Sequence, residues 1–282
     1  MEYDQWERSL TEHYRRPELA ATLRGALEKA GKTVRSYKDT AAFDEFHMRG
    51  REATRELAAL AGMREGLAVL DLGCGLGGPA RLLAAEYGCT VTGIDLMAEF
   101  VDAAAMLSRM VGLTDKVSFR QGNMLALPFD PATFDTVWSQ HTLMNIAAKQ
   151  TLFEQLHRVL RPSGTLALYE VVAGTMAPRH YPVQWAGDAT IDFLVDGPAL
   201  LDQLATAGFA PLIWQDTTAA CLQWFETIQT KMAQRPKGAP PPVALNLVIG
   251  PTTAEKAKNT VRNLREDRIR VIYGVLKKSD HG

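Results

Sequence analysis

A glycine-rich turn between a short apolar strand and a helix is the feature that most constrains the fold of this chain. The segment is VLDLGCGLGGPA, residues 69–80. Gly73, Gly75 and Gly78 satisfy the loose pattern G-x-G-x-x-G, and glycines allow positive φ angles and a close approach of backbone to ligand. Asp95 ends the next predicted strand, where a carboxylate can bind ribose hydroxyls. These features predict a site for a nucleoside-type cofactor.

The sequence around this turn alternates short apolar strands with helices. Strands are predicted at 67–72, 89–95, 116–122, 134–140 and 164–172, with helices at 81–88, 97–111 and 149–160. Repeated β–α units predict a parallel sheet covered by helices on both faces, with right-handed crossovers.

Beyond residue 172 the pattern changes. It predicts a helix at 197–208, a strand at 210–217, helices at 218–234 and 253–268, and a last strand at 268–276. The proline-rich stretch 235–251 is not expected to form a regular helix. Residues 1–60 indicate helices without a clear strand. We therefore expect a helical N-terminal cap over 1–60 and an α/β core over 61–282, with lid insertions near 176–195 and 218–251.

Composition excludes several classes of protein. The 282 residues carry 31 Lys plus Arg and 32 Asp plus Glu, a net charge of −1, so general binding to nucleic acid is not expected. Three cysteines, Cys74, Cys89 and Cys221, show no metal-ligand spacing and indicate a reducing compartment. Neither a secretory signal nor a membrane span is evident, so we expect a cytoplasmic globular protein.

A family resemblance separates the two cofactors, NAD and S-adenosylmethionine, that the glycine pattern leaves open. The chain resembles the class I S-adenosylmethionine-dependent methyltransferases in DLGCGLGGPA (71–80), GID (93–95), GNMLALPFD (122–130), FDTVWSQ (134–140) and LRPSGTL (160–166). The resemblance is specific over roughly 60–175 and looser over 197–276. It implies a Rossmann-like, doubly wound sheet, mostly parallel, with an antiparallel last strand whose place RIRVIYGVL fits.

The resemblance also implies residues that bind S-adenosylmethionine. Gly73 and Gly75 would let the backbone lie against the methionine moiety, and Asp71 would hold its ammonium group, through water. Asp95 would bind both ribose hydroxyls. The residues implied at the adenine ring are Leu96 and Met97 beside it, Asn123 at its edge and Met124 as an apolar neighbour. An Asp is commoner than Asn at position 123 in the family.

Candidate catalytic residues come from the edge of the sheet where ligands bind. Gln140 and His141 follow a predicted strand at its carboxyl end, so they should face the methyl donor or the acceptor. His47 lies in FDEFHMRG (43–50), and similar segments close over the cofactor in related enzymes. By that resemblance Arg49, or alternatively Arg51, would meet the methionine carboxylate. His141 is the first candidate for a general base and His47 the second.

Aromatic side chains of the second half could line an acceptor pocket. Tyr181, Trp185 and Trp224 are the candidates, although aromatic residues also serve as ordinary core. Apolar lids in such enzymes can also form a homodimer surface.

The predicted function is methyl transfer to a small molecule by in-line displacement, in which alignment of the acceptor supplies much of the rate. No metal is needed for this chemistry. The acceptor atom stays open among N, S, O and C, with thiol or sulfide S-methylation and C-methylation of a quinone- or sterol-like acceptor as specific alternatives. A nicotinamide oxidoreductase and a non-catalytic cofactor-binding protein are the alternatives from other classes.

Overall fold

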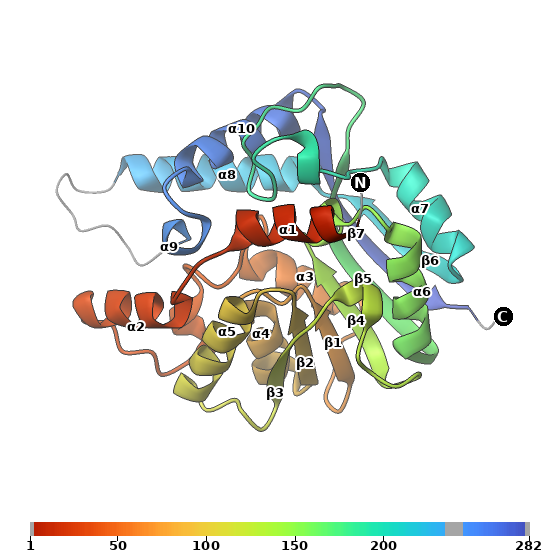
Figure 1. Cartoon of the computed structure of the whole chain (residues 1–282), viewed down its shortest axis with the longest axis horizontal. Coiled ribbons are helices and arrows are strands. Elements are labelled where there is room, and N and C mark those ends of the chain that lie inside the picture. The colour runs from red at the N-terminus through yellow and green to blue at the C-terminus, as the bar shows by residue number, and fades with distance from the viewer. Residues whose placement is uncertain (1–2, 235–244, 280–282) are drawn as a thin grey trace.

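The structure is a computed structural model that describes residues 3–234 and 245–279, and within this part the strands form one seven-stranded sheet (Figure 1). The order across the sheet is β3-β2-β1-β4-β5-β7-β6. The strands are β1 (Ala68–Leu72), β2 (Thr90–Asp95), β3 (Val117–Gln121), β4 (Phe134–Gln140), β5 (Leu160–Ala173), β6 (Phe209–Asp216) and β7 (Ile269–Lys278).

The direction of the strands agrees with the sequence prediction. β1 to β5 pair in parallel, whereas β7 is inserted between β5 and β6 and runs antiparallel to both. The predicted Rossmann-like sheet with an antiparallel last strand is therefore confirmed.

Helices cover both faces of this sheet (Figure 1). They are α1 (Tyr3–Tyr14), α2 (Leu19–Lys29), α3 (Arg51–Leu60), α4 (Gly78–Tyr87), α5 (Ala98–Met110), α6 (Lys149–Val159), α7 (Gly197–Thr206), α8 (Thr218–Ala233), α9 (Asn246–Ile249) and α10 (Thr253–Arg265). From the centre of the sheet the chain moves outward through β2 and β3, and later in the other direction through β5. Right-handed crossovers therefore place α4 and α5 on one face and α6 on the other.

Local sequence explains where the helix after the glycine turn begins and ends. Pro79 occupies its first turn, where the missing N–H has no helical partner to lose. The helix ends at Gly88, which has φ of 70° and donates its N–H to the carbonyl of Ala84. Glycine adopts this left-handed conformation without a steric penalty.

Most predicted boundaries lie within three residues of the observed ones, and two features differ more. The strand predicted at 164–172 begins at Leu160, because Leu160 pairs with Phe134 beyond an irregularity in the β4 ladder. The short helix α9 lies inside the proline-rich stretch 235–251, between Pro242 and Pro251, where LNLVI carries no helix breaker. Residues 235–244 of that stretch, and of the predicted lid at 218–251, lie outside the described residues.

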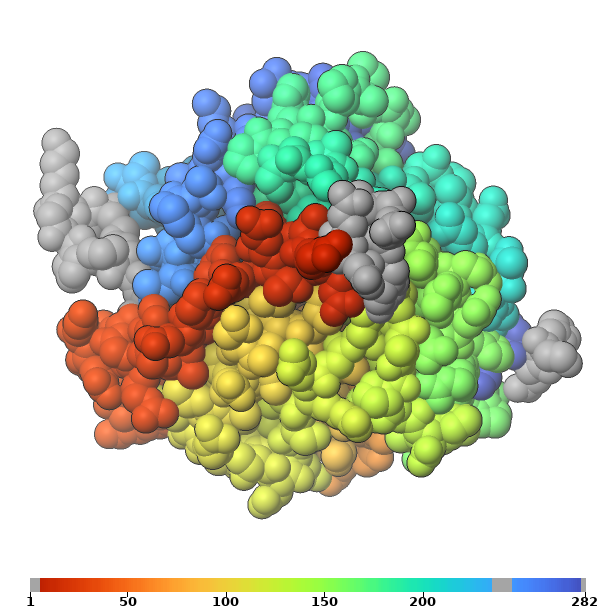
Figure 2. All heavy atoms as spheres, viewed as in Figure 1, coloured from red at the N-terminus to blue at the C-terminus, as the bar shows by residue number. Residues whose placement is uncertain are grey.

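The N-terminal segment covers the carboxyl ends of the strands. In Figure 2 it forms a red band between the yellow-green part of the surface and the blue and teal part. α2 packs on α5, and α1 contacts the turn η4 (Ala189–Ile191) in the predicted lid. No helix in the described part of the chain is long and apolar enough to cross a membrane.

Candidate active site

The glycine turn is enclosed by side chains from distant segments. Gly73 and Gly75 have φ of 65° and 51°. A Cβ atom at Gly73 would lie 2.8 Å from the Thr142 side chain, and one at Gly75 would lie 2.8 Å from the Phe46 ring. Any larger residue would therefore collide with its cover as well as strain the backbone. The turn can approach a ligand with its backbone alone.

Asp95 is held in a fixed orientation at the end of β2. Its Oδ2 accepts a hydrogen bond from the Gly75 N–H at 2.9 Å, and its Oδ1 accepts one from the Met97 N–H at 3.0 Å. Each carboxylate oxygen keeps further lone-pair capacity. The strand end thus presents a preorganised acceptor pair beside the glycine turn.

Asp71 lies within β1 below that turn, and its environment is unusual for a carboxyl group. The side chain is buried, and Oδ2 has no hydrogen-bond partner. Its pKa is raised to about 8, mainly by burial and also by the nearby charges of Glu45 and Asp95. Arg81 has a smaller effect in the opposite direction. An unpartnered buried carboxyl of this kind fits a cationic ligand group, which would supply the missing countercharge.

The predicted adenine-site residues come from the ends of two paired strands. Leu96 and Met97 follow β2, and Asn123 and Met124 follow β3, whose last residue pairs with Asp95. Met97 is buried, and the other three are half-buried. The Asn123 side chain accepts a hydrogen bond from the Leu125 N–H at 2.8 Å, so its oxygen also caps the turn η2 (Met124–Ala126). The four residues thus follow the carboxyl ends of two adjacent strands.

His141 follows β4 and has the left-handed backbone conformation, with φ of 52°. Its ring stacks on Tyr169 with centroids 4.8 Å apart, and its buried Nε2 has no hydrogen-bond partner. Burial, and secondarily the nearby His47, hold its pKa well below the ordinary value. The imidazole is therefore neutral near pH 7, with a nitrogen free to accept or donate a proton.

Gln140 precedes His141 and faces the same region. Its Oε1 accepts a hydrogen bond from the Trp138 indole at 2.8 Å, whereas its buried Nε2 has no partner. Because β1 and β4 are adjacent, with Leu72 paired to Ser139, the free amide of Gln140 and the free oxygen of Asp71 belong to neighbouring strands. Unsatisfied buried polar atoms of this kind indicate a ligand site.

His47 reaches the site from the segment before α3, with its ring centroid 6.0 Å from that of His141. Its Nε2 lies 2.7 Å from a Glu45 carboxylate oxygen and its Nδ1 lies 3.1 Å from the Met48 carbonyl oxygen. Both partners are acceptors, so the ring offers no free nitrogen to a substrate. His47 is therefore in the site, but both of its ring nitrogens are occupied by contacts within the protein.

Arg49 does not point toward the glycine turn. It donates two hydrogen bonds to Glu56, at 2.6 and 2.8 Å, and one to Glu52 at 2.9 Å. Hydrogen bonds to these carboxylates raise its pKa above the ordinary value. The alternative, Arg51, contacts Asp44 and Glu45 at 3.6 and 3.4 Å. The partners of both arginines lie within seven residues of them in sequence, but the sequence did not show that these acids, rather than a ligand, bind the guanidinium groups.

The three predicted aromatic residues occupy different surroundings. Tyr181 donates to Asp192 at 2.5 Å, and Trp185 is buried with an unpartnered indole N–H. Trp224 is half-buried on α8 and packs edge-on against Phe225 at 4.9 Å. Only Trp185 combines burial with an unsatisfied polar atom.

Sequence reasoning missed the residue that joins the covering segments, Asn145. Its amide nitrogen donates to the carbonyl oxygens of Trp185 and Ile191 at 2.9 and 2.8 Å. Its side-chain oxygen accepts from the Tyr14 hydroxyl at 2.8 Å, and its backbone carbonyl accepts from the Trp6 indole at 2.7 Å. The contacts span more than 100 residues of sequence to α1, so no local pattern could indicate them.

Glu170 is a second buried residue that the sequence did not single out. It accepts hydrogen bonds from the Ser139 hydroxyl at 2.6 Å and from the N–H groups of Thr142 and Leu143 at 2.9 and 3.1 Å. Burial raises its pKa to about 7. It fixes the loop that carries His141. The strand pattern LALYEVV was the available signal, since it places an acid among apolar strand residues.

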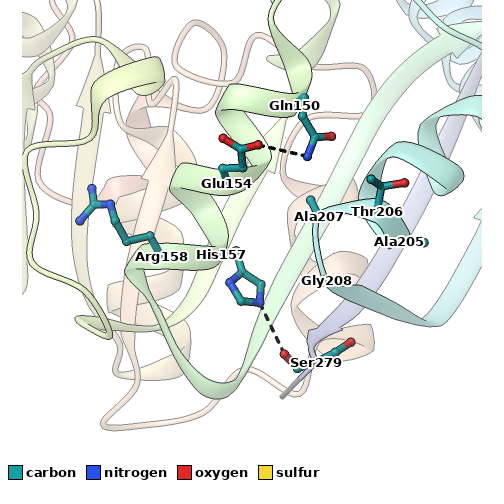
Figure 3. Close-up of a pocket in the computed structure, with 9 residues that line it drawn as sticks. All are labelled: Gln150, Glu154, His157, Arg158, Ala205, Thr206, Ala207, Gly208 and Ser279. Atoms are coloured by element: carbon teal, nitrogen blue, oxygen red, sulfur yellow. Dashed lines mark hydrogen bonds between the residues drawn. The ribbon is translucent and has the colours of Figure 1, made fainter. Parts of the chain in front are cut away.

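A separate groove lies at the opposite edge of the sheet, between α6 and α7 (Figure 3). His157 lies in the last turn of α6, just before β5, and Gly208 precedes β6, so the groove is at the amino ends of these strands. Its lining residues are Gln150, Glu154, His157, Arg158, Ala205, Thr206, Ala207, Gly208 and Ser279. No predicted site residue lines it. Among the described residues, no group of three or more His, Cys, Asp or Glu side chains is placed to hold a metal ion.

Comparison with known proteins agrees with this geometry. Residues 70–168 match the family model described as a methyltransferase domain. Residues 70–168 therefore form a methyltransferase domain of the class I S-adenosylmethionine-dependent type. The family predicted from the sequence is thus confirmed.

One curated relative is a sterol 24-C-methyltransferase of Eremothecium gossypii, which is 34% identical over 167 residues, covering 57% of this chain and 44% of the relative. The chain covers between 30% and 51% of the length of the first three curated relatives.

Solved structures resemble the chain over nearly its whole length. The geranyl diphosphate C-methyltransferase of Streptomyces coelicolor A3(2), solved with Mg2+, geranyl diphosphate and S-adenosyl-L-homocysteine, has a TM-score of 0.70 and 19% identity. The alignment covers 97% of each chain. The [4+2]-cyclase SpnF has a TM-score of 0.67 and 22% identity, and the alignment covers 97% of this chain and 96% of the cyclase. At these identities the likeness concerns the fold.

Proposed function

We propose that this chain transfers a methyl group from S-adenosylmethionine to a small-molecule acceptor. The observation that carries the proposal is the group of carboxyls around the glycine turn, where Glu45 and Asp95 help raise the pKa of Asp71 to about 8. A sulfonium and an ammonium group beside these carboxyls would stabilise their ionised forms, whereas a pyrophosphate would be repelled by those that are ionised. The site therefore favours S-adenosylmethionine over NAD.

The cofactor-binding residues follow from their places at the strand ends. Asp71 and the free amide of Gln140 would bind the polar end of the methionine moiety, and Asp95 would bind the ribose hydroxyls through its remaining lone pairs. The adenine ring would lie among Leu96, Met97 and Met124, with the Asn123 amide at its edge. Arg49 has no part in this assignment, because its guanidinium is bound to Glu52 and Glu56.

S-adenosylmethionine supplies an activated methyl group, so the protein needs to align the acceptor and remove a proton where the acceptor carries one. His141 suits the second task. Its imidazole is buried and neutral, and Nε2 is free. His47 is held by Glu45 and the Met48 carbonyl, so we assign it to shaping the site rather than to accepting a proton.

The names of the two methyltransferases compared above, a sterol 24-C-methyltransferase and a geranyl diphosphate C-methyltransferase, give a small-molecule acceptor and methylation at carbon. A carbon acceptor is therefore the second, more specific candidate here. His141, whose ring stacks on the buried Tyr169 with centroids 4.8 Å apart, is the end of this aromatic stack that an acceptor could reach, and aromatic groups stabilise a developing positive charge. Trp185, Tyr181 and Trp224 would contribute to the acceptor side.

The proposal also includes the remaining expectations from sequence. We assign residues 1–60 as a cap and 176–195 as a lid on a core that extends to residue 282. A cytoplasmic location is part of the proposal, and a homodimer is compatible with it.

Release of S-adenosylhomocysteine from S-adenosylmethionine tests the function directly. Purified protein would be mixed with a panel of thiols (including sulfide), amines, phenols and alkenes, and calorimetry would measure binding of S-adenosylhomocysteine and NADH. Binding of S-adenosylhomocysteine with turnover of one acceptor class supports the proposal. Binding of NADH instead would overturn it, and binding of S-adenosylhomocysteine without turnover on any acceptor would favour a non-catalytic role.

A further inference from the structure

A buried ion pair joins the helix of the glycine turn to the segment that covers it. Arg81 on α4 and Asp44 both have fully buried side chains, and the guanidinium Nη2 donates to the Asp44 carboxylate at 2.7 Å. Arg81 also contacts α5, at the Ser108 hydroxyl and the Ala104 carbonyl oxygen, at 3.3 and 3.4 Å. One cation therefore ties three segments together.

The backbone on both sides of this pair is in close contact. A Cβ atom at Gly78 would lie 2.3 Å from the Asp44 carbonyl oxygen, so only glycine fits at the start of α4. The covering segment therefore lies directly on the first turn of the helix that follows the glycine loop.

The residues just after Asp44 reach the site itself. Phe46 lies over Gly75 and packs edge-on against Phe100, with centroids 5.8 Å apart. The ring of His47 packs against His141 and against Tyr169, with centroids 6.0 and 5.7 Å apart. Any displacement of Asp44 would shift both side chains relative to the glycine turn.

We propose that Asp44 and Arg81 are positioning residues, whose ion pair holds Phe46 and His47 in register over the cofactor-binding turn. The inference rests on the proposed function. An exposed salt bridge offers a matched comparison: Arg55 on α3 contacts Glu86 on α4 at 2.7 Å, with side chains 45% and 23% exposed. It joins α4 to the same N-terminal region without burying either charge.

The test measures S-adenosylhomocysteine affinity by calorimetry and unfolding midpoints by urea for the full chain and its variants. Arg81→Met should raise the Kd about tenfold or more and lower the midpoint, because it leaves the buried Asp44 carboxylate with only the longer contact to Arg51, at 3.6 Å. In Asp44→Asn/Arg81→Met no buried charge is unpaired. This double variant should recover most of the midpoint but keep the raised Kd. Arg55→Met should change the Kd less than about twofold.

A double-mutant cycle tests whether Arg81 influences the Kd through Phe46. Phe46→Ala should raise the Kd by itself, and in Phe46→Ala/Arg81→Met the two effects should not add, because both remove the same cover. The conservative variant Asp44→Asn keeps the shape of the side chain. It replaces Arg81→Met in the binding measurement if Arg81→Met does not fold. For that variant we expect a raised Kd as well.

The outcomes separate this inference from the proposed function. If the wild-type protein does not bind S-adenosylhomocysteine, the proposed function fails. If the wild type binds and the double variant binds equally well while only the midpoint of Arg81→Met falls, the pair is purely structural and the positioning role is wrong. Additive effects in the Phe46 cycle would also overturn it.

Discussion

The two halves of the ligand-binding edge are covered by different kinds of contact. Over the cofactor half, the covering segment is attached by the buried charges of Asp44 and Arg81. Over the half proposed to bind the acceptor, α1 and the predicted lid at 176–195 are attached to Asn145 by hydrogen bonds between neutral groups. Per contact, removing one partner of a buried ion pair costs about 3–5 kcal/mol, whereas leaving one buried neutral group without its hydrogen bond costs about 1–3 kcal/mol. The acceptor half is therefore the side that we expect to open.

The largest effect in this comparison is expected when the neutral hydrogen bonds of Asn145 are removed. Asn145→Leu leaves the Tyr14 hydroxyl and two backbone carbonyls without partners, so the free energy of unfolding should fall by about 3 kcal/mol. Hydrogen exchange of α1 should quicken more than that of residues 43–50. Asn259→Leu is the control, since it loses one half-buried contact to the Pro182 carbonyl. Equal quickening of both covers would contradict the comparison.

The next prediction tests chemistry on the acceptor half. His141→Asn keeps a residue that tolerates the left-handed backbone but removes the imidazole, so kcat should fall about 100-fold while cofactor affinity stays the same. The control His157→Asn changes a histidine in the groove between α6 and α7. Full retained turnover of His141→Asn, measured with an acceptor that carries a proton, would assign His141 a structural role.

On the cofactor half, Asp95→Ala should weaken S-adenosylmethionine binding by about 2 kcal/mol, the scale of lost charge-assisted hydrogen bonds. Calorimetry measures this directly. Asp102→Ala, an exposed acid on α5, should leave the affinity unchanged. An unaltered affinity for Asp95→Ala would rule out the ribose-binding role.

The smallest effect concerns proton binding by the cofactor half. With its pKa raised to about 8, Asp71 keeps its proton when folded but loses it near pH 4 when unfolded. The free energy of unfolding therefore falls as pH rises between these values. Asp71→Asn cannot ionise, so between pH 5 and pH 8 the cofactor-free variant should lose at least about 1 kcal/mol less than the wild type. Urea unfolding of both proteins at both pH values measures the difference. The contribution of Glu170 is the same in the wild type and the variant, so it cancels. Parallel losses would show that Asp71 is not buried as a neutral acid.

The sequence predicted the sheet well because its signals are local. VLDLGCGLGGPA contains a strand, a turn and a helix start, and RIRVIYGVL carries a strand pattern in the place expected for an antiparallel last strand. The positions of Asp71, Asp95 and His141 followed from strand ends. Partner choice did not follow, because the sequence does not show which acids a side chain meets after folding. Arg49 pairs with Glu56, seven residues away, instead of a ligand, and nothing in the sequence marks Asp44 as the partner of Arg81, 37 positions later.

The attachment of α1 to Asn145 has a consequence for synthesis on the ribosome. Trp6 and Tyr14 precede their partner by 139 and 131 positions. Until the stretch after β4 has left the exit tunnel, the indole and the hydroxyl have nowhere to dock, and an isolated helix of this length is marginal in water. The N-terminal helix is therefore translated before the sheet but can assemble only after half of the chain exists, which leaves nascent-chain chaperones a long interval in which to bind it.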